Sequence, residues 1–166
     1  MKKNEFIKAK TNSLNTHKKY LAWKRKNVTL RGVKKLGEPN KIWGSFGRGL
    51  YTAALSNKAM AKQYGKVYFV VNNNPKNPKI AKTLNRAELI RQDLIEAFCN
   101  KHGEKYNIDF FEQHTSIESE MLKLGYDGLI IPGREMVNYT PPNNILYFEN
   151  EEDLKNYYLR SIEPNL

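Results

Sequence analysis

The apolar stretches of this chain are short, and glycine, proline and asparagine separate them repeatedly. Several stretches are rich in β-branched and aromatic side chains or alternate between apolar and polar residues, which is typical of short strands. The expected strands are 27–33, 50–53, 67–72, 126–131, 135–139 and 145–148. A doubly wound parallel sheet needs longer strands in regular alternation with helices. The pattern therefore predicts a single α+β domain built on one or two small sheets.

Helical signals surround these strands. Asn85 followed by Glu88, and Thr115 followed by Glu118, each form the pattern of a capping box at a helix start. Behind Asn85, apolar residues recur at helical spacing up to a stop at Gly103. Further expected elements are a short helix at 57–64, a last helix at 154–159, a basic helix at 5–24 and loops at 34–41 and 73–78.

The chain has a net charge of +11 at pH 7, and the excess lies toward its N-terminal end. Residues 1–27 contain nine lysines and arginines and a single acidic residue, Glu5, and Tyr20 and Trp23 lie among the lysines. A basic segment favours polyanionic partners, and aromatic side chains stack on bases. We therefore expect a basic arm or helix at 1–27 that binds RNA or DNA, followed by a folded domain at 28–166. The alternative is a solvated arm that aids solubility.

Cysteine usage and hydropathy limit the compartment and the cofactors. Cys99 is the single cysteine, so no disulfide forms within the chain, which is typical of a reducing cytoplasm. No apolar run reaches the length of a membrane span, and no apolar signal core follows the N-terminal lysines. The three histidines lack metal-ligand spacing. The sequence predicts a cytoplasmic protein without a membrane partner or a metal cofactor.

The segment from Trp43 to Tyr64 is the strongest candidate for a binding site. It contains three glycines around Arg48, then a short strand and a helix that ends on a tyrosine. Glycine lets a backbone approach a ligand closely, and two aromatic rings can hold a flat ring between them. The segment lacks the Gly-Lys-Ser or Gly-Lys-Thr of a Walker loop and the fingerprint of a Rossmann fold. It therefore predicts a site for a small, planar, phosphorylated ligand.

Four fragments occur in a defined order along the chain. They are Leu30-Arg31-Gly32, Phe46-Gly47-Arg48-Gly49-Leu50-Tyr51, Ala61-Lys62-Gln63-Tyr64 and Gly133-Arg134-Glu135-Met136-Val137. In this order and spacing they resemble the ADP-ribosyltransferase superfamily. The middle block is most similar to the poly-ADP-ribose polymerase branch, which carries F-G-K-G-I-Y-F-A and then a helix that ends in tyrosine. The segment L-G-Y-D-G-L-I-I at 124–131 is similar to one in small phage-encoded and bacterial transferases. The resemblance covers roughly residues 28–148.

The resemblance implies a fold of split sheets made of short, mostly antiparallel strands with flanking helices. It also implies an enzyme that breaks the nicotinamide–ribose bond of NAD and transfers ADP-ribose to an acceptor without a metal. The transition state of this reaction has oxocarbenium character, as in glycoside cleavage. By resemblance, Glu135 is the carboxylate that binds the ribose hydroxyl and stabilises the developing positive charge.

The remaining roles follow from the same resemblance. Tyr51 and Tyr64 would stack on the two faces of nicotinamide, and Gly32 would offer backbone groups to its carboxamide. Arg31 would meet the NAD phosphates or the adjoining ribose, so that Arg31, Tyr51 and Glu135 form the catalytic triad. The other expected cofactor-binding residues are Ser45, Phe46, Gly47, Arg48 and Gly49.

The sequence departs from both main branches of the superfamily. The polymerase branch has histidine at the position of Arg31, and the arginine-modifying toxins have a Ser-Thr-Ser run where this chain has Leu50-Tyr51-Thr52. Those toxins also carry an acidic residue two positions before the catalytic glutamate, where this chain has Gly133. The acidic pair Glu118 and Glu120 lies on an expected helix and is not taken as the catalytic pair. The missing acid favours RNA or DNA over protein as the acceptor.

These features predict a mono-ADP-ribosyltransferase of the toxin or phage-effector type. Its expected partners are NAD, a nucleic-acid or protein acceptor and, for a toxin, an antitoxin. Two alternatives stay open. One is an NAD glycohydrolase on the same fold, which passes ADP-ribose to water, and the other is a non-catalytic basic nucleic-acid-binding protein.

Overall fold

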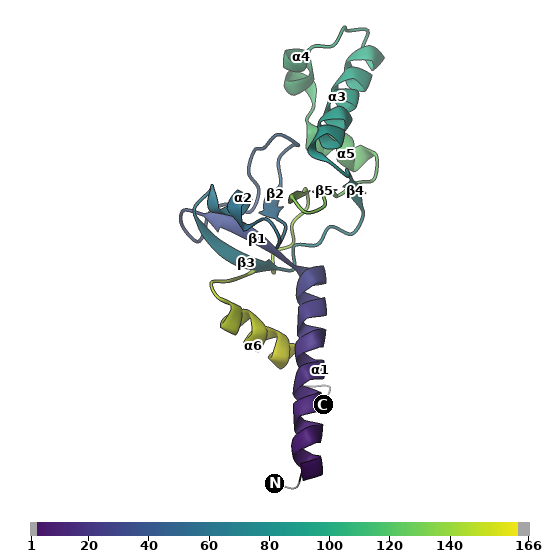
Figure 1. The fold of residues 1–166 in the computed structure, drawn as a ribbon. Coiled ribbons are helices and arrows are strands. Elements are labelled where there is room, and N and C mark those ends of the chain that lie inside the picture. The colour runs from purple at the N-terminus through teal and green to yellow at the C-terminus, as the bar shows by residue number, and fades with distance from the viewer. Residues whose placement is uncertain (1–2, 163–166) are drawn as a thin grey trace.

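A mixed sheet of seven strands organises the structure, a computed structural model that describes residues 3–162 except the side chains of residues 6–11 (Figure 1). The strands are β1 (Val28–Val33), β2 (Leu50–Ala53), β3 (Lys66–Val71), β4 (Pro78–Ile80), β5 (Gly128–Ile131), β6 (Glu135–Asn138) and β7 (Leu146–Phe148). Their order across the sheet is β4-β5-β6-β2-β1-β3-β7, and all neighbours are antiparallel except β4 and β5. The sheet does not close, and the predicted α+β fold of a single domain is confirmed. Residues 1–2 of the expected arm and residues 163–166 of the expected domain lie outside the described residues.

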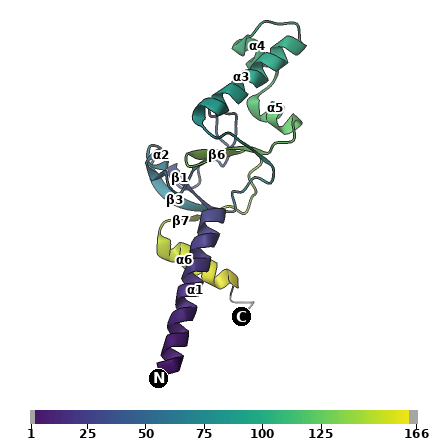
Figure 2. The same cartoon turned by 45° about the vertical axis from the view of Figure 1, so that its right-hand side comes forward.

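Five of the six helices in the described part form two groups at opposite ends of the sheet, and the sixth, α2 (Lys58–Lys62), packs against β1. The five are α1 (Lys3–Asn27), α3 (Leu84–Lys101), α4 (Ile108–His114), α5 (Ile117–Lys123) and α6 (Glu151–Ile162). Helices α3, α4 and α5 lie together beyond β4 and β5, whereas α1 and α6 lie side by side at the opposite end (Figures 1 and 2). Among residues 3–162, no helix contains a stretch long and apolar enough to span a membrane.

The two central strands, β1 and β2, separate soon after they meet. Their register contains the pair Leu30 and Ala53, whereas β1 pairs with β3 over its whole length. Continued antiparallel pairing would place Gly32 opposite Tyr51, but the strands diverge before that point. The sheet is therefore continuous, and it opens at its centre between β1 and β2.

The C-terminal part of α1 is packed into the folded domain. Tyr20 is 1% exposed, its ring lies 5.6 Å from that of Tyr158 on α6, and its hydroxyl donates a hydrogen bond to Glu151. The ring of Trp23 lies 5.1 Å from the same Tyr158 ring. Both aromatic side chains thus hold α1 against α6, and neither is free to stack on bases as the sequence suggested. The N-terminal part of α1 extends away from the sheet (Figures 1 and 2).

Helix starts differ from the expected caps by one or two residues. Helix α3 starts after Thr83, whose side chain accepts a backbone hydrogen bond, and not at Asn85. Helix α5 starts after Ser116 instead of Thr115, and α2 starts after Asn57. Each true cap is a Ser, Thr or Asn, which all accept hydrogen bonds from the first turn. Because such residues are neighbours here, local sequence does not distinguish between them.

Two elements form where the sequence predicted none. Strand β4 occupies part of the expected loop at 73–78 and continues to Ile80. Its first residue, Pro78, is tolerated because β4 is an edge strand, where a missing N–H removes no ladder hydrogen bond. Helix α4 is a two-turn helix capped by Asn107, whose side chain accepts a hydrogen bond from the Phe110 N–H.

Candidate functional site

A cavity of about 780 Å³ lies beside the opening between β1 and β2. This volume is within the roughly 300–1,000 Å³ of typical small-molecule sites. All four fragments identified in the sequence contribute to its wall, through Gly32, Tyr51, Tyr64 and Glu135. Among the other expected site residues, Arg31, Ser45 and Phe46 also line it.

The register of the sheet explains why residues distant in sequence meet at this cavity. Glu135 of β6 pairs with Ala53 of β2, and Ala53 pairs with Leu30 of β1. Side chains two residues apart on a strand share a face of the sheet. Gly32 therefore shares a face with Leu30, and Tyr51 shares it with Ala53. Three strands thus bring Gly32, Tyr51 and Glu135 to one face, around the opening.

The ring of Tyr51 is held in place by the glycine-rich loop. Its hydroxyl donates a hydrogen bond to the Gly47 carbonyl oxygen at 2.5 Å and accepts one from the Phe46 N–H at 3.1 Å. A Cβ at Gly44 would lie 2.3 Å from Cζ of Tyr51, so only glycine fits beside this ring. Burial raises the pKa of Tyr51, and the nearby carboxylate of Glu135 acts in the same direction. Tyr51 is therefore a neutral, oriented phenol at physiological pH.

Helix α2 lies directly against Gly32. A Cβ at this position would lie 1.7 Å from the Ala61 carbonyl oxygen and 3.3 Å from Cβ of Tyr64. Glycine is thus required here by the packing of α2 on β1, in addition to any contact with a ligand. The close approach brings Tyr64, whose side chain is 62% exposed, to the edge of the cavity. Its ring remains available to a ligand.

The carboxylate of Glu135 keeps unused acceptor capacity. Its side chain is 20% exposed, and its partner among the described residues is Arg134, whose Nε lies 3.6 Å from Oε1. That Nε is buried and makes no hydrogen bond within the described part of the chain. A carboxylate has about four acceptor positions. Glu135 can therefore accept hydrogen bonds from ligand hydroxyl groups, with the Arg134 guanidinium beside it as an ion-pair partner.

Arg31 has different partners from those the sequence suggested. Its guanidinium donates to the Pro39 carbonyl oxygen at 2.7 Å, to the Tyr147 hydroxyl at 2.5 Å and, more weakly, to Asn40 Oδ1 at 3.4 Å. The side chain is only 5% exposed. The reason is the alternation of strand β1, which directs Arg31 to the opposite face from Gly32. Arg31 thus fixes the loop at 34–41 beside the cavity, and its bonds to Pro39, Tyr147 and Asn40 use three of the five N–H donors of the guanidinium.

The second half of the glycine-rich loop is a packing element. Gly47, Arg48 and Gly49 are outside the cavity wall. The Arg48 N–H donates to Glu118 of α5 at 3.0 Å, and Gly47 has a φ of +104°, a conformation that favours glycine. A Cβ at Gly49 would lie 2.6 Å from the Asn138 carbonyl oxygen. The ring of Phe46 likewise packs in the core under α3 to α5, at 4% exposure, although the residue borders the cavity.

Sequence reasoning missed several residues of the cavity wall. Trp43 is 76% exposed at the cavity, and the Arg48 guanidinium lies 5.8 Å from its ring centre. Glu38 and Glu88 reach the wall from the loop at 34–41 and from α3. No local signal marks these residues, because their position depends on how loop and helix pack on the sheet. Trp43 stood at the start of the candidate segment and could have been selected.

The wall of the cavity combines aromatic rings with charged groups of both signs, since Glu38 and Glu88 lie there as well. Tyr51 and Tyr64 offer aromatic rings, Glu135 offers a carboxylate, and Lys34 and Arg134 carry positive charge at the wall. Within residues 3–162, no group of three or more His, Cys, Asp or Glu side chains is arranged to hold a metal ion. The side chains around the cavity offer rings for stacking, hydrogen-bonding groups and charges.

Comparisons with known proteins found no match. No protein-family model matches the sequence, and neither curated proteins nor solved structures give a significant match.

Proposed function

We propose that the protein is an NAD-dependent mono-ADP-ribosyltransferase that uses this cavity. The observation that carries the proposal is that Gly32, Tyr51, Tyr64 and Glu135 line one cavity, although they come from four separate segments of the chain. Cleavage of NAD requires a clamp for a flat ring, polar groups for its carboxamide and a carboxylate near the ribose. These four residues supply all three.

In the proposed reaction, nicotinamide lies between the rings of Tyr51 and Tyr64. The bond between the pyridinium nitrogen and C1′ of the ribose breaks, and nicotinamide leaves with the electron pair. Positive charge develops at C1′, where the Glu135 carboxylate stabilises it and accepts a hydrogen bond from a ribose hydroxyl. The nucleophile of the acceptor then bonds to C1′ and releases its proton to solvent.

The phosphates of NAD have different partners in this proposal from those the resemblance implies. Because Arg31 already bonds to Pro39 and Tyr147, we assign the phosphates to Lys34 and Arg134 at the cavity wall. Arg31 then acts as a positioning residue, which holds the loop that carries Lys34.

The acceptor side of the cavity is open. A Cβ at Gly133, two positions before Glu135, would meet no atom within 4 Å. No side chain at this position orients a protein nucleophile, and the net charge of +11 favours a nucleic-acid acceptor. The same open space admits water, so hydrolysis of NAD is the second candidate function.

Labelled NAD tests the proposal and separates the candidates. NAD labelled in the adenosine part is incubated with cell lysate and with wild type, Glu135→Gln or Glu96→Gln, the last being an exposed carboxylate on α3. We expect wild type and Glu96→Gln to label material that nuclease degrades, and Glu135→Gln to label none. Nicotinamide release that is independent of any acceptor indicates the hydrolase. Equal labelling by wild type and Glu135→Gln contradicts the proposed site.

A further inference from the structure

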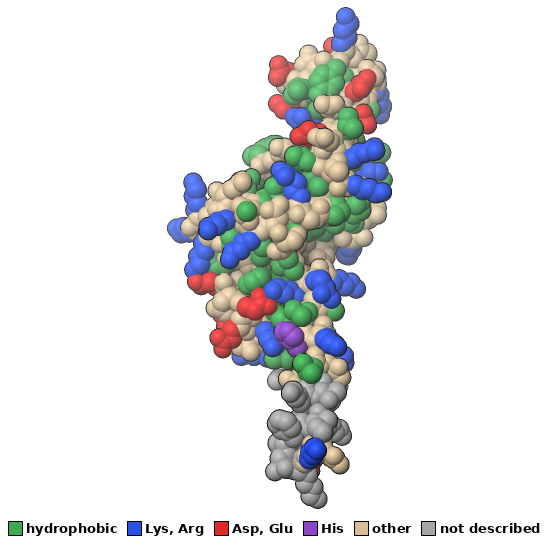
Figure 3. Space-filling model, in the orientation of Figure 1, with side chains coloured by type: hydrophobic (Ala, Val, Ile, Leu, Met, Phe, Trp, Pro, Cys, Tyr) green, Lys and Arg blue, Asp and Glu red, His purple; other side chains and the backbone are tan. Residues whose placement is uncertain are grey.

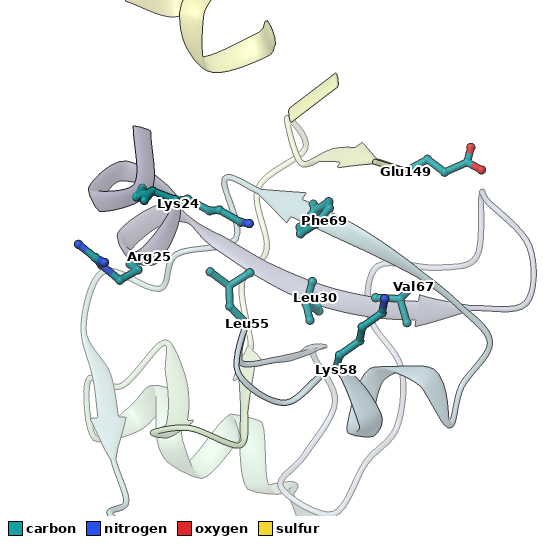
Figure 4. Close-up of a pocket in the computed structure, with 9 residues that line it drawn as sticks. Lys24, Arg25, Leu30, Leu55, Lys58, Val67, Phe69 and Glu149 are labelled. Atoms are coloured by element: carbon teal, nitrogen blue, oxygen red, sulfur yellow. The ribbon is translucent and has the colours of Figure 1, made fainter. Parts of the chain in front are cut away.

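A second hollow, of about 390 Å³, lies between α1, α2 and the strands β1 and β3 (Figure 4). We call it the basic groove, and its lining consists of Leu21, Lys24, Arg25, Leu30, Leu55, Lys58, Val67, Phe69 and Glu149. The one carboxylate in this set, Glu149, forms an ion pair with Lys66. Lys24 of α1 and Lys58 of α2 extend toward it from two sides, with the leucine side chains between them (Figure 4). The groove thus combines an apolar floor with cationic walls.

The basic groove keeps positive charge that the protein does not neutralise. Lys24 forms an ion pair with Glu151 at 2.7 Å, and its ammonium lies 5.0 Å above the ring of Phe69. Arg25 and Lys58 form no ion pair with any residue of the described ranges. Figure 3 shows further basic side chains along α1 and over the sheet. Lys58 extends toward the hollow, whereas the guanidinium of Arg25 points away from it at the rim (Figure 4), so an anion is attracted by Lys58 in the groove and by Arg25 beside it.

The basic groove and the catalytic cavity are neighbours. Leu30 lies in the groove and Gly32 in the cavity, two residues apart on the same face of β1, which is about 7 Å along a strand. Helix α2 contributes Lys58 to the groove and Ala61 to the cavity. A molecule that occupies the groove and reaches the catalytic cavity must pass around α2, which packs on β1 through Ala61 and Gly32.

We propose that the basic groove binds a single strand of nucleic acid and presents it to the catalytic cavity. Arg25 and Lys58 contact its phosphates, and a base covers the apolar floor. A nucleic-acid strand offers a phosphate and a base in every nucleotide, which matches cationic side chains beside an apolar floor. The role of the strand as the acceptor rests on the proposed function, whereas its binding does not.

Fluorescence anisotropy with a short labelled RNA strand, and with DNA of the same sequence, tests this inference without NAD. Binding is measured between about 50 and 200 mM salt, where each phosphate contact adds about 0.7 to the slope of log K against log salt for a single strand. The double variant Arg25→Gln/Lys58→Gln should show a slope shallower by about 1.4, for two lost contacts. The control Lys82→Gln/Lys105→Gln removes the same charge from exposed positions outside the groove. Urea denaturation should give the same midpoint for both variants.

Three results would overturn the inference. They are equal slopes for the groove variant and its control, no binding of either strand by wild type, and equally tight binding of a polyglutamate peptide. Glu135→Gln should bind the strand as wild type does. If the groove variant loses the strand while wild type leaves NAD intact, the groove is supported and the proposed transferase function fails.

Discussion

Replacement of Gly32 by alanine tests the close approach of α2 to β1. The added Cβ would lie 1.7 Å from the Ala61 carbonyl oxygen, whereas ordinary contact begins near 3.4 Å. Helix α2 would have to move by about 3.4 − 1.7 = 1.7 Å to relieve the overlap. Overpacking of this kind destabilises a protein by about 1–3 kcal/mol. Because Cβ of Tyr64 lies 3.3 Å from the same point, the shift also displaces the ring at the cavity edge.

Two assays separate the effect of Gly32→Ala on stability from its effect on the cavity. Urea denaturation should show the free energy of unfolding lowered by about 1–3 kcal/mol, and nicotinamide release should show a raised KM for NAD. Gly103→Ala is the control, because its φ of +73° strains alanine by about 1–2 kcal/mol but no atom lies within 4 Å of the added Cβ. That variant should lose stability and keep its KM. An unchanged free energy of unfolding for Gly32→Ala would refute the described packing of α2.

Three further perturbations have expected outcomes. Arg31→Lys should lower the free energy of unfolding by about 2 kcal/mol or more, because an ammonium cannot replace the forked contacts to Pro39 and Tyr147. Limited proteolysis of this variant should cut faster within residues 34–41, and an unchanged cleavage rate would contradict the anchoring role of Arg31. Tyr51→Phe should cost about 1–3 kcal/mol in urea denaturation, because the Phe46 N–H and the Gly47 carbonyl lose their shared partner. Since burial raises the pKa of Tyr51 above its ordinary 10.0, wild-type stability should be flat just below pH 10 and fall above it as the unfolded state ionises, and the fall should be smaller in Tyr51→Phe. Burial opposes ionisation of Glu151, but hydrogen bonds from Lys24 and Tyr20 outweigh this effect and lower the pKa of Glu151 below 4.5. Stability should therefore be lost as the pH falls through that range, and Glu151→Gln should reduce this acid sensitivity. An identical acid profile for the variant would contradict the Tyr20–Glu151–Lys24 contact.

Most strands could be predicted because their signals are local. The six expected strands agree with β1, β2, β3, β5, β6 and β7 to within two residues at each end. Strand β4 could not be found in this way, since its three residues become a strand only through pairing with β5. The shift of the α3 cap from Asn85 to Thr83 has a similar cause, because both residues can cap and packing decides between them.

The candidate site could be predicted only where backbone geometry follows from sequence. The period of two on β1 places Arg31 and Gly32 on opposite faces of the strand, but both residues border the cavity, so their assignment to one ligand stays a prediction. The contact between Gly32 and the Ala61 carbonyl depends on how α2 docks, which no local pattern reveals. Glu118 was set aside as a catalytic acid, and the structure gives it a different use, as the acceptor for the Arg48 N–H.

For α1, the expectation from the sequence and the packing in the structure differ most. Tyr20 and Trp23 were expected to stack on bases, but both pack against Tyr158 of α6. A single sequence does not show that α6 returns to α1, because the two helices are far apart along the chain. Many basic side chains stay exposed, and among them Arg25 and Lys58 border the groove proposed for the acceptor strand.

The most direct test of the central claim is the release of nicotinamide from NAD by the purified protein. It is measured for wild type, Glu135→Gln and Glu96→Gln, with and without a single-stranded nucleic acid. We predict that wild type and Glu96→Gln release nicotinamide, that the strand increases the rate, and that Glu135→Gln is inactive while it keeps the wild-type urea midpoint. Failure of wild type to release nicotinamide, or equal release by folded Glu135→Gln, would contradict the assignment of this cavity to NAD cleavage.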